Sequence, residues 1–390
     1  MATCHGVEVV ATLVAPFRAR ALPWDTFAPT TPGGLALPAL GTHGASRRAM
    51  AILVTGGAGY IGSHMVLCLV RAGRPVVVVD NLSAGYRELL VEGVPFVHAD
   101  IADGATMRDV IRERDIDAII HFAAHTQVAE SVRDPRLYWS GNVAATLNLL
   151  DAALASGVKY FVFSSTAAVY GEPERCPIDE EAPTHPINPY GESKLTIEQA
   201  LADYARAYGM RYAALRYFNA AGADADAGLG ELHHPESHLI PIVLQAALGR
   251  MSEVVIFGRQ YPTPDGTCIR DYVHVLDLAD AHMAALDDLR CGGDSGAFNL
   301  GTGTGHSVAE VIATCREVTG RPIAVVEGER RPGDPPVLVA SPERARRRYG
   351  WEPRRSSLER IVRDAWAWHL REAAKSSHEP ETRKAHAQHR

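Results

Sequence analysis

Short apolar runs alternate with segments of helical pattern between residues 50 and 217 of this 390-residue chain. Uninterrupted apolar runs of about five residues are typical of strands that are buried on both faces of a parallel sheet. The runs lie at 50–55, 75–79, 119–124 and 161–165, and helices are expected at 63–72 and 143–156, the second opened by Asn142. This alternation predicts an α/β fold with a doubly wound parallel sheet of the Rossmann type.

The pattern loosens after residue 217. Long Gly- and Pro-containing loops at 220–236 and 258–266 predict a smaller C-terminal substrate-binding domain, 218–373, with segments that return to the sheet. Residues 1–49 have no clear period, and Met50 stands directly before the first strand. We therefore expect 1–49 to be a disordered extension or a mis-assigned start, and the polar segment 374–390 to be a disordered tail.

A glycine-rich turn follows the first predicted strand. Gly56, Gly59 and Gly62 recur every third residue, which permits a tight turn and a close approach of the backbone to a pyrophosphate at a helix N-terminus. Asp80 closes the second strand, eighteen residues after Gly62. A carboxylate there accepts hydrogen bonds from a ribose 2′-hydroxyl and repels a 2′-phosphate. The residues thus predict a dinucleotide-binding domain at 50–217 that prefers NAD to NADP.

Composition narrows the class of protein. The chain is 46% hydrophobic and 22% charged, which is ordinary for a soluble globular protein, and its formal charge of −7 gives no reason to expect nucleic acid. No stretch approaches the length of a membrane span. Six cysteines without paired spacing predict free thiols in a reducing compartment such as the cytoplasm. His233, His234 and His238 match no coordination spacing, so we expect exposed loop histidines and no metal.

Tyr190 and Lys194 are the strongest candidates for chemistry. Residues four apart lie on one face of a helix, and an ammonium near a phenol favours the phenolate. Lowering a tyrosine pKa from about 10 to near 7 takes roughly 4 kcal/mol, and would make a base for a sugar hydroxyl. Thr166 adds a hydroxyl at the carboxyl end of the 161–165 strand, where open α/β sheets gather ligands.

Several longer motifs carry a family resemblance. The segments Asn188-Pro189-Tyr190-Gly191, Phe218-Asn219, Phe257 to Val275 and Arg331-Pro332-Gly333-Asp334 resemble those of the UDP-glucose 4-epimerase family within the extended short-chain dehydrogenase/reductases, and the similarity covers about residues 50–370. The resemblance implies a homodimeric enzyme that interconverts UDP-galactose and UDP-glucose through a 4-keto sugar, with tightly bound NAD.

The resemblance also implies roles for individual residues. Tyr190, Lys194 and Thr166 would be catalytic. The cofactor would contact Gly56, Gly59, Tyr60, Ile61, Gly62, Asp80, Asn81, Asp100, Ile101, Phe122, Ala123, Ala124, Asn142, Tyr190, Lys194 and Phe218. The UDP-sugar would contact Thr166, Asn219, His238, Leu239, Arg270, Arg331, Asp334 and Leu338. In this scheme the two arginines pair with the diphosphate, because guanidinium matches phosphate oxygens.

Two departures from the family pattern mean that the motifs do not determine which UDP-sugar is the substrate. His238 replaces an Asn that precedes Leu239 in well-known bacterial members, and Leu338 stands where some members carry a bulky Tyr. A UDP-N-acetylhexosamine is therefore an alternative substrate, as are UDP-arabinose and UDP-glucuronate. A 4,6-dehydratase would need an Asp-Glu pair after Thr166, where Ala167 and Ala168 cannot transfer protons. An NAD-sensing regulator would typically lack the Tyr or the Lys.

Overall fold

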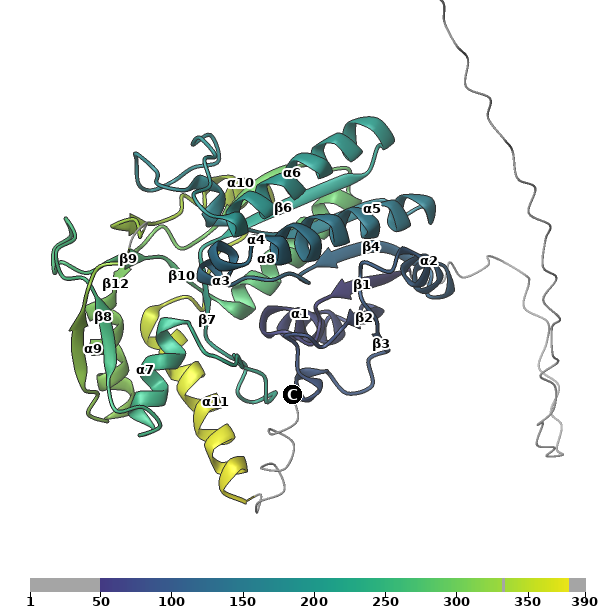
Figure 1. Ribbon diagram of the computed structural model, residues 1–390. Coiled ribbons are helices and arrows are strands. Elements are labelled where there is room, and N and C mark those ends of the chain that lie inside the picture. Colours follow the sequence, from purple (N-terminus) through teal and green to yellow (C-terminus); the bar gives the residue numbers. More distant parts are fainter. Residues whose placement is uncertain (1–49, 332–333, 379–390) are drawn as a thin grey trace, which may run out of the picture. The chain divides into compact units, whose positions relative to one another are not determined.

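A parallel sheet of seven strands, in the order β11-β6-β5-β4-β1-β2-β3, forms the larger part of the computed structural model. The structure describes residues 50–331 and 334–378, so the predicted extension 1–49 lies outside it. The order reverses between β1 and β4, which confirms the doubly wound α/β class (Figure 1). The strands are β1 (Ala51–Thr55), β2 (Val76–Asp80), β3 (Phe96–His98), β4 (Ile116–His121), β5 (Tyr160–Thr166), β6 (Arg211–Tyr217) and β11 (Gly296–Leu300).

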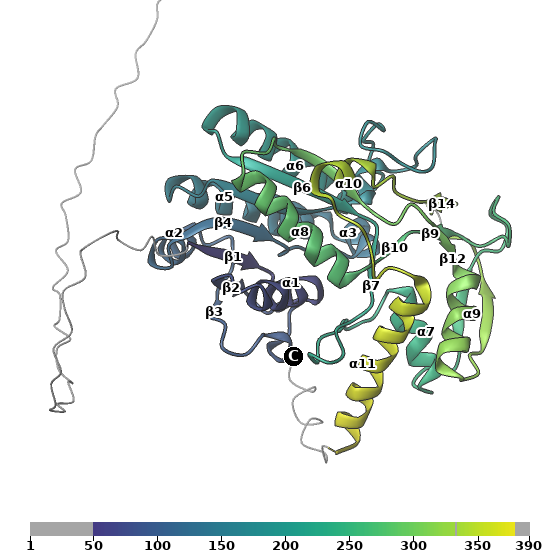
Figure 2. The ribbon, with the colours of Figure 1, turned by 180° about the vertical axis from the view of Figure 1, so that it is seen from behind.

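Helices cover both faces of this sheet because its strands are apolar on both. Along β1, Ile52 and Val54 join the core beneath α1 (Tyr60–Arg71) and α8 (Val275–Arg290), whereas Leu53 joins the core on the opposite face. Figures 1 and 2 show these two layers from opposite sides. The second layer consists of α2 (Gly104–Glu113), α5 (Ala145–Ala155) and α6 (Pro189–Tyr208).

The helical segment before α5 differs from our expectation. Asn142 does not open the helix, because it lies inside a π-helical turn, η2 (Trp139–Ala144), that runs without a break into α5. Two short helices, α3 (Val128–Arg133) and α4 (Pro135–Tyr138), precede that turn. Single π-helical turns often occur at functional sites, and this one places Asn142 in the interior.

The segments after residue 217 form a second layered unit and also return to the sheet through α8 and β11. The unit has its own core, which includes Val243, Ile312 and Ile361. Its main elements are α7 (Leu239–Ala247), α9 (Val308–Thr319), α11 (Leu358–His378) and the parallel pair β8 (Val254–Phe257) and β13 (Val325–Gly328). Helix α11 extends beyond residue 374, where we predicted the tail to begin, and 379–390 lie outside the described residues.

Short elements connect the two units. Strands β7 (Asn219–Ala221) and β10 (Tyr272–His274) pair with each other, and β12 (His306–Ser307), β9 (Ile269–Arg270) and β14 (Val337–Leu338) form a small sheet. The remaining elements are η1 (Arg87–Leu89), η3 (Ala167–Tyr170) and α10 (Glu343–Tyr349). Among the described residues, no helix is long and apolar enough to cross a membrane. The five cysteines that the structure describes are free thiols.

Three fully buried histidines predict sensitivity to acid. Burial lowers the pKa of His64 and of His282 to about 4, and that of His121 to about 3. Below the unfolded-chain pKa of about 6.5 the unfolded chain binds protons that the folded chain excludes, so stability falls as the pH decreases from there. At pH 5 we expect each of these histidines to lower the free energy of unfolding by about 2 kcal/mol.

Urea unfolding at pH 7.5 and pH 5 checks this expectation. In His282→Gln, the loss of stability between the two pH values should be about 2 kcal/mol smaller than in the parent, because the substituted side chain no longer binds a proton on unfolding. His185→Asn changes an exposed histidine and should lose as much stability as the parent chain. An unchanged loss in His282→Gln would contradict the assignment.

Candidate active site

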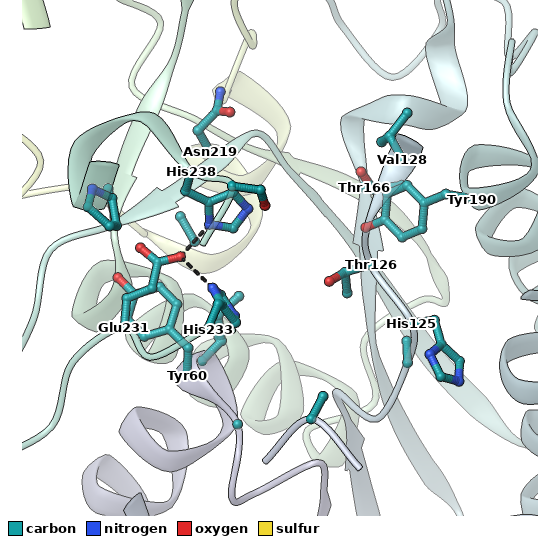
Figure 3. A pocket seen from close by; sticks show the side chains of 18 of the residues that line it. Tyr60, His125, Thr126, Val128, Thr166, Tyr190, Asn219, Glu231, His233 and His238 are labelled. Carbon is teal, nitrogen blue, oxygen red and sulfur yellow. Dashed lines mark hydrogen bonds and ion pairs between the residues drawn. The ribbon is translucent and has the colours of Figure 1, made fainter. Parts of the chain in front are cut away.

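A cavity of about 890 Å³ opens at the carboxyl edge of the large sheet. One part of its lining follows strands β1, β2, β4 and β5 of the large sheet. The other part comes from α7, β8 and β9. Figure 3 shows Tyr190 and Thr166 on one side of this space, with Glu231, His233 and His238 on the opposite side. The cavity thus lies where doubly wound sheets bind ligands.

The glycine turn forms one end of the cavity. A Cβ atom at Gly62 would lie 2.1 Å from the Gly56 carbonyl oxygen, so only glycine lets the first turn of α1 close against this turn. Asp80 borders the same space, and its carboxylate accepts hydrogen bonds from the backbone N–H groups of Ala58 (3.0 Å) and Leu82 (2.8 Å). A helix N-terminus for an anion and a fixed carboxylate for a hydroxyl therefore lie side by side.

The start of α6 positions Tyr190. The Asn188 side chain accepts a hydrogen bond from the Gly191 N–H (2.9 Å), and Pro189 occupies the first helical position. A Cβ atom at Gly191 would lie 2.6 Å from the Ala168 carbonyl oxygen, so glycine permits α6 to pack closely on η3. The Tyr190 side chain consequently lies beside that of Thr166 on one side of the cavity (Figure 3).

The predicted stabilisation of a Tyr190 phenolate by Lys194 together with bound nicotinamide stays a prediction, and the protein alone shows what opposes it. Burial raises the pKa of Tyr190, and the hydrogen bond from Thr166 acts against this rise. Lys194 donates instead to the Ser164 carbonyl oxygen (2.9 Å), and its Nζ lies 4.9 Å from the centre of the Phe163 ring. Burial also lowers the pKa of Lys194 to about 7, opposed by the charge of Glu198.

Most of the predicted cofactor residues line the cavity. These are Gly56, Gly59, Tyr60, Ile61, Gly62, Asp80, Asn81, Asp100, Ile101, Phe122, Ala123, Ala124, Tyr190 and Phe218. Asn142 and Lys194 are buried behind them. The Asn142 side chain exchanges hydrogen bonds with the backbone N–H (2.8 Å) and carbonyl (3.0 Å) of His125 and donates to Ser193 Oγ (3.1 Å). Asn142 therefore ties the loop after β4 to α6.

The predicted substrate residues divide in the same way. Thr166, Asn219, His238, Leu239, Arg270, Arg331 and Asp334 line the cavity. Leu338 packs instead against a small core that contains Tyr170 and Ile178. Arg270 donates to the carbonyl oxygens of Ile269 and Pro335, each at 2.9 Å, and Arg331 lies 3.8 Å from the centre of the Phe257 ring. Two guanidinium groups are thus held at the cavity wall.

A cluster that we did not predict occupies the wall opposite Tyr190. The loop cluster consists of Glu231, His233, Glu236 and His238. The Nδ1 atoms of His233 (3.3 Å) and His238 both face Glu231 Oε1. His234 and His238 are exposed loop residues as we expected, whereas His233 is only partly exposed. Burial alone would raise the pKa of Glu231, but the facing histidines lower it to about 2. The spacing Glu-x-His-x-x-Glu-x-His was the available sequence signal.

Comparison with known proteins identifies the family. The model of the NAD dependent epimerase/dehydratase family matches residues 52–301. The chain belongs to this family. It is 55% identical to UDP-glucose 4-epimerase of Halalkalibacterium halodurans, over 82% of this chain and 96% of that protein. This confirms the resemblance that the motifs indicated.

Solved structures agree with this assignment. UDP-glucose 4-epimerase from Brucella ovis in complex with NAD is 48% identical with a TM-score of 0.80, covering 82% of this chain and 98% of that one. UDP-glucose-4-epimerase from Stenotrophomonas maltophila with bound NAD and formylated UDP-arabinopyranose is 43% identical with a TM-score of 0.81, covering 84% and 99%. This chain therefore shares with these epimerases both sequence and fold.

Gly62→Ala tests the glycine turn. The added methyl group would overlap the Gly56 carbonyl oxygen, so the turn must shift, at a cost of about 1–3 kcal/mol. We expect a lower melting temperature and at least a tenfold loss of bound NAD, measured by cofactor release and absorbance. Gly104→Ala is the matched control, because its Cβ would have only ordinary contacts, the nearest at 3.5 Å. Full NAD content in Gly62→Ala would show that close approach is not required.

Proposed function

We propose that this protein interconverts UDP-galactose and UDP-glucose by epimerisation at C4 of the hexose, with NAD as a tightly bound cofactor. The observation that carries the proposal is that the hydroxyl groups of Tyr190 and Thr166 face one cavity. The glycine turn and the guanidinium groups of Arg270 and Arg331 line the same cavity. The family membership and the identity to UDP-glucose 4-epimerases support the same activity.

The lining fits NAD at one end of the cavity. The close approach at Gly62 and the N-terminus of α1 suit a pyrophosphate, and the Asp80 carboxylate suits a ribose diol. Asn81 donates to Asp100 (2.9 Å), which orders the wall on the adenine side. NAD, when bound, supplies the acceptor and donor of the C4 hydride. We assign residues 50–217 to this end and residues 218–373 mainly to the sugar nucleotide.

Tyr190 acts on the proton of the sugar O4. Its hydroxyl lies beside that of Thr166, which can relay the proton and donate to the oxygen that changes from alcohol to ketone. Because burial raises the pKa of Tyr190, ionisation requires a nearby positive charge, and the charge of an oxidised nicotinamide adds to that of Lys194. Lys194 also holds the end of β5 in place through Ser164. The same phenol returns the proton when the sugar is reduced on its other face.

The diphosphate and uridine bind on the opposite wall. Arg270 is oriented by two carbonyl oxygens, and its Nη2 lies 3.8 Å from Asp334 Oδ1, so the guanidinium is fixed at the cavity wall, where it can meet phosphate oxygens. Arg331 packs on Phe257, an exposed ring that also lines the cavity and can pack against a base. Asn219 is held by a hydrogen bond from its Nδ2 to the Asp271 carbonyl (3.1 Å), and its oxygen can contact the sugar or phosphate.

The preferred sugar is a separate proposal. Leu338 packs toward Tyr170 and puts no bulky side chain into the cavity, so we propose that UDP-N-acetylhexosamines are turned over as well, with UDP-arabinose and UDP-glucuronate as further alternatives. Ala167 and Ala168 offer no acid or base for dehydration. We also propose that the enzyme is a cytoplasmic homodimer, in keeping with its free cysteines.

Tyr190→Phe separates binding from chemistry. Removing the hydroxyl should lower kcat by about 10²–10⁴-fold, because proton transfer is lost, and leave bound NAD and the melting temperature nearly unchanged. Tyr204→Phe makes the same change on the same helix outside the cavity, and should retain parental kcat. Turnover of Tyr190→Phe within a few-fold of the parent would remove Tyr190 from this role.

The activity itself is tested without added cofactor. The purified full chain is incubated with UDP-galactose, and UDP-glucose is separated by chromatography. We expect conversion to the equilibrium mixture without external NAD, because the cofactor is regenerated in each turnover. No conversion by protein that contains NAD would refute the hexose assignment, and the same assay with UDP-N-acetylgalactosamine, UDP-arabinose and UDP-glucuronate would then identify the substrate.

A further inference from the structure

The loop cluster has the composition of a metal site. It offers two imidazole nitrogens and two carboxylate oxygens within a single eight-residue segment, and these four atoms all lie within 4.8 Å of one another. Two carboxylates balance the charge of a divalent cation when the imidazoles bind as neutral ligands. We propose that the loop cluster binds one divalent transition-metal ion of the zinc class.

Two distances in the loop cluster match a small tetrahedral site, whereas His238 Nδ1 and Glu231 Oε1 are in direct hydrogen-bond contact and would have to separate around an ion. Zinc–nitrogen and zinc–oxygen bonds of about 2.0–2.2 Å place neighbouring ligand atoms about 3.3–3.5 Å apart. His233 Nδ1 lies 3.3 Å from Glu231 Oε1 and 3.6 Å from Glu236 Oε1. The rings of His233 and His238 make an edge-to-face contact, with centroids 5.3 Å apart, and both Nδ1 atoms face Glu231 Oε1.

The surroundings already fix the two carboxylates. Glu231 is 5% exposed, whereas Glu236 Oε1 accepts hydrogen bonds from the backbone N–H groups of Ser237 (2.8 Å) and His238 (2.9 Å). A buried carboxylate with a second carboxylate nearby is unfavourable without compensating positive charge. The facing histidines supply that charge when they are protonated, and a cation at the centre would supply it to both carboxylates with neutral imidazoles.

The ligand types select the class of ion. Calcium and magnesium prefer oxygen ligands only, and magnesium keeps several waters. Two imidazoles with two carboxylates suit Zn²⁺ and its neighbours in the first transition series. Four ligands from the protein fill a tetrahedral shell, which is the pattern of a structural zinc site and not of a catalytic one. The ion would therefore hold the loop 231–238 at the cavity wall and fix the start of α7 at His238.

Metal titration of the purified full chain tests the proposal independently of epimerase activity. The protein is treated with EDTA, freed of chelator by gel filtration, and titrated with Co²⁺ and then Zn²⁺. We expect one equivalent per chain, the intense visible absorption of four-coordinate Co²⁺, its loss when Zn²⁺ displaces Co²⁺, and a higher melting temperature with Zn²⁺. A weak octahedral spectrum, or binding of less than one equivalent, would overturn the proposal.

Substitutions locate the ion. His233→Asn and Glu236→Gln should each weaken Zn²⁺ binding by at least about tenfold, since even changes to groups that only support a metal ligand cost 10–100-fold. His306→Asn and Cys176→Ser change a histidine paired with Glu310 and an exposed thiol elsewhere, and should bind as the parent does. Unchanged affinity in His233→Asn and Glu236→Gln would refute the site. If either variant fails to fold in EDTA, as judged by circular dichroism, the other variant and the Co²⁺ spectrum of the parent decide.

Discussion

The place of α6 on the sheet depends on a buried ion pair between Glu198 and Arg216. The guanidinium of Arg216, on β6, donates to both carboxylate oxygens of Glu198, with Nε–Oε1 at 3.0 Å and Nη2–Oε2 at 2.6 Å. Ser165 also donates to Glu198, and Arg216 donates to the Tyr170 hydroxyl (2.9 Å). Breaking a buried pair on one side costs about 3–5 kcal/mol. Because Tyr190 lies about two turns before Glu198 on α6, this pair also sets its position beside β5.

The parts that the sequence predicts correctly are those fixed by neighbours along the chain. The glycine turn, the helix after it and Asp80 follow one another within one strand–helix–strand unit, and each works through local backbone geometry. The start of α6 is similarly local, since Asn188, Pro189 and Gly191 act within one helical turn. Parallel strands bring their carboxyl ends to one edge, so the cavity could be placed as well.

The residues that could not be predicted are those whose partners are far away in the chain. Lys194 has the spacing of a partner for Tyr190, yet the carbonyl of Ser164, thirty residues earlier, binds its ammonium. Asn142 donates to Ser193 across the boundary between η2 and α6. Leu338 packs beside Tyr170 and Ile178, next to the bridge between Ile178 and Ala340. A hydrophobic pattern along the chain cannot reveal such contacts, because they arise from packing between elements that are far apart in the sequence.

The segment before the loop cluster is attached to α1, the helix that follows the glycine turn. Tyr60, the first residue of α1, donates to the Gly222 carbonyl (2.7 Å), and Arg71 at its other end pairs with Asp224 (2.6 Å). Further along, Gly230 packs on Trp368 of α11. Both ends of the cavity are therefore attached to α1, so opening the dinucleotide end would disturb the loop and its buried contacts. These contacts oppose a movement of α1 away from the loop, in keeping with the proposed tight binding of NAD.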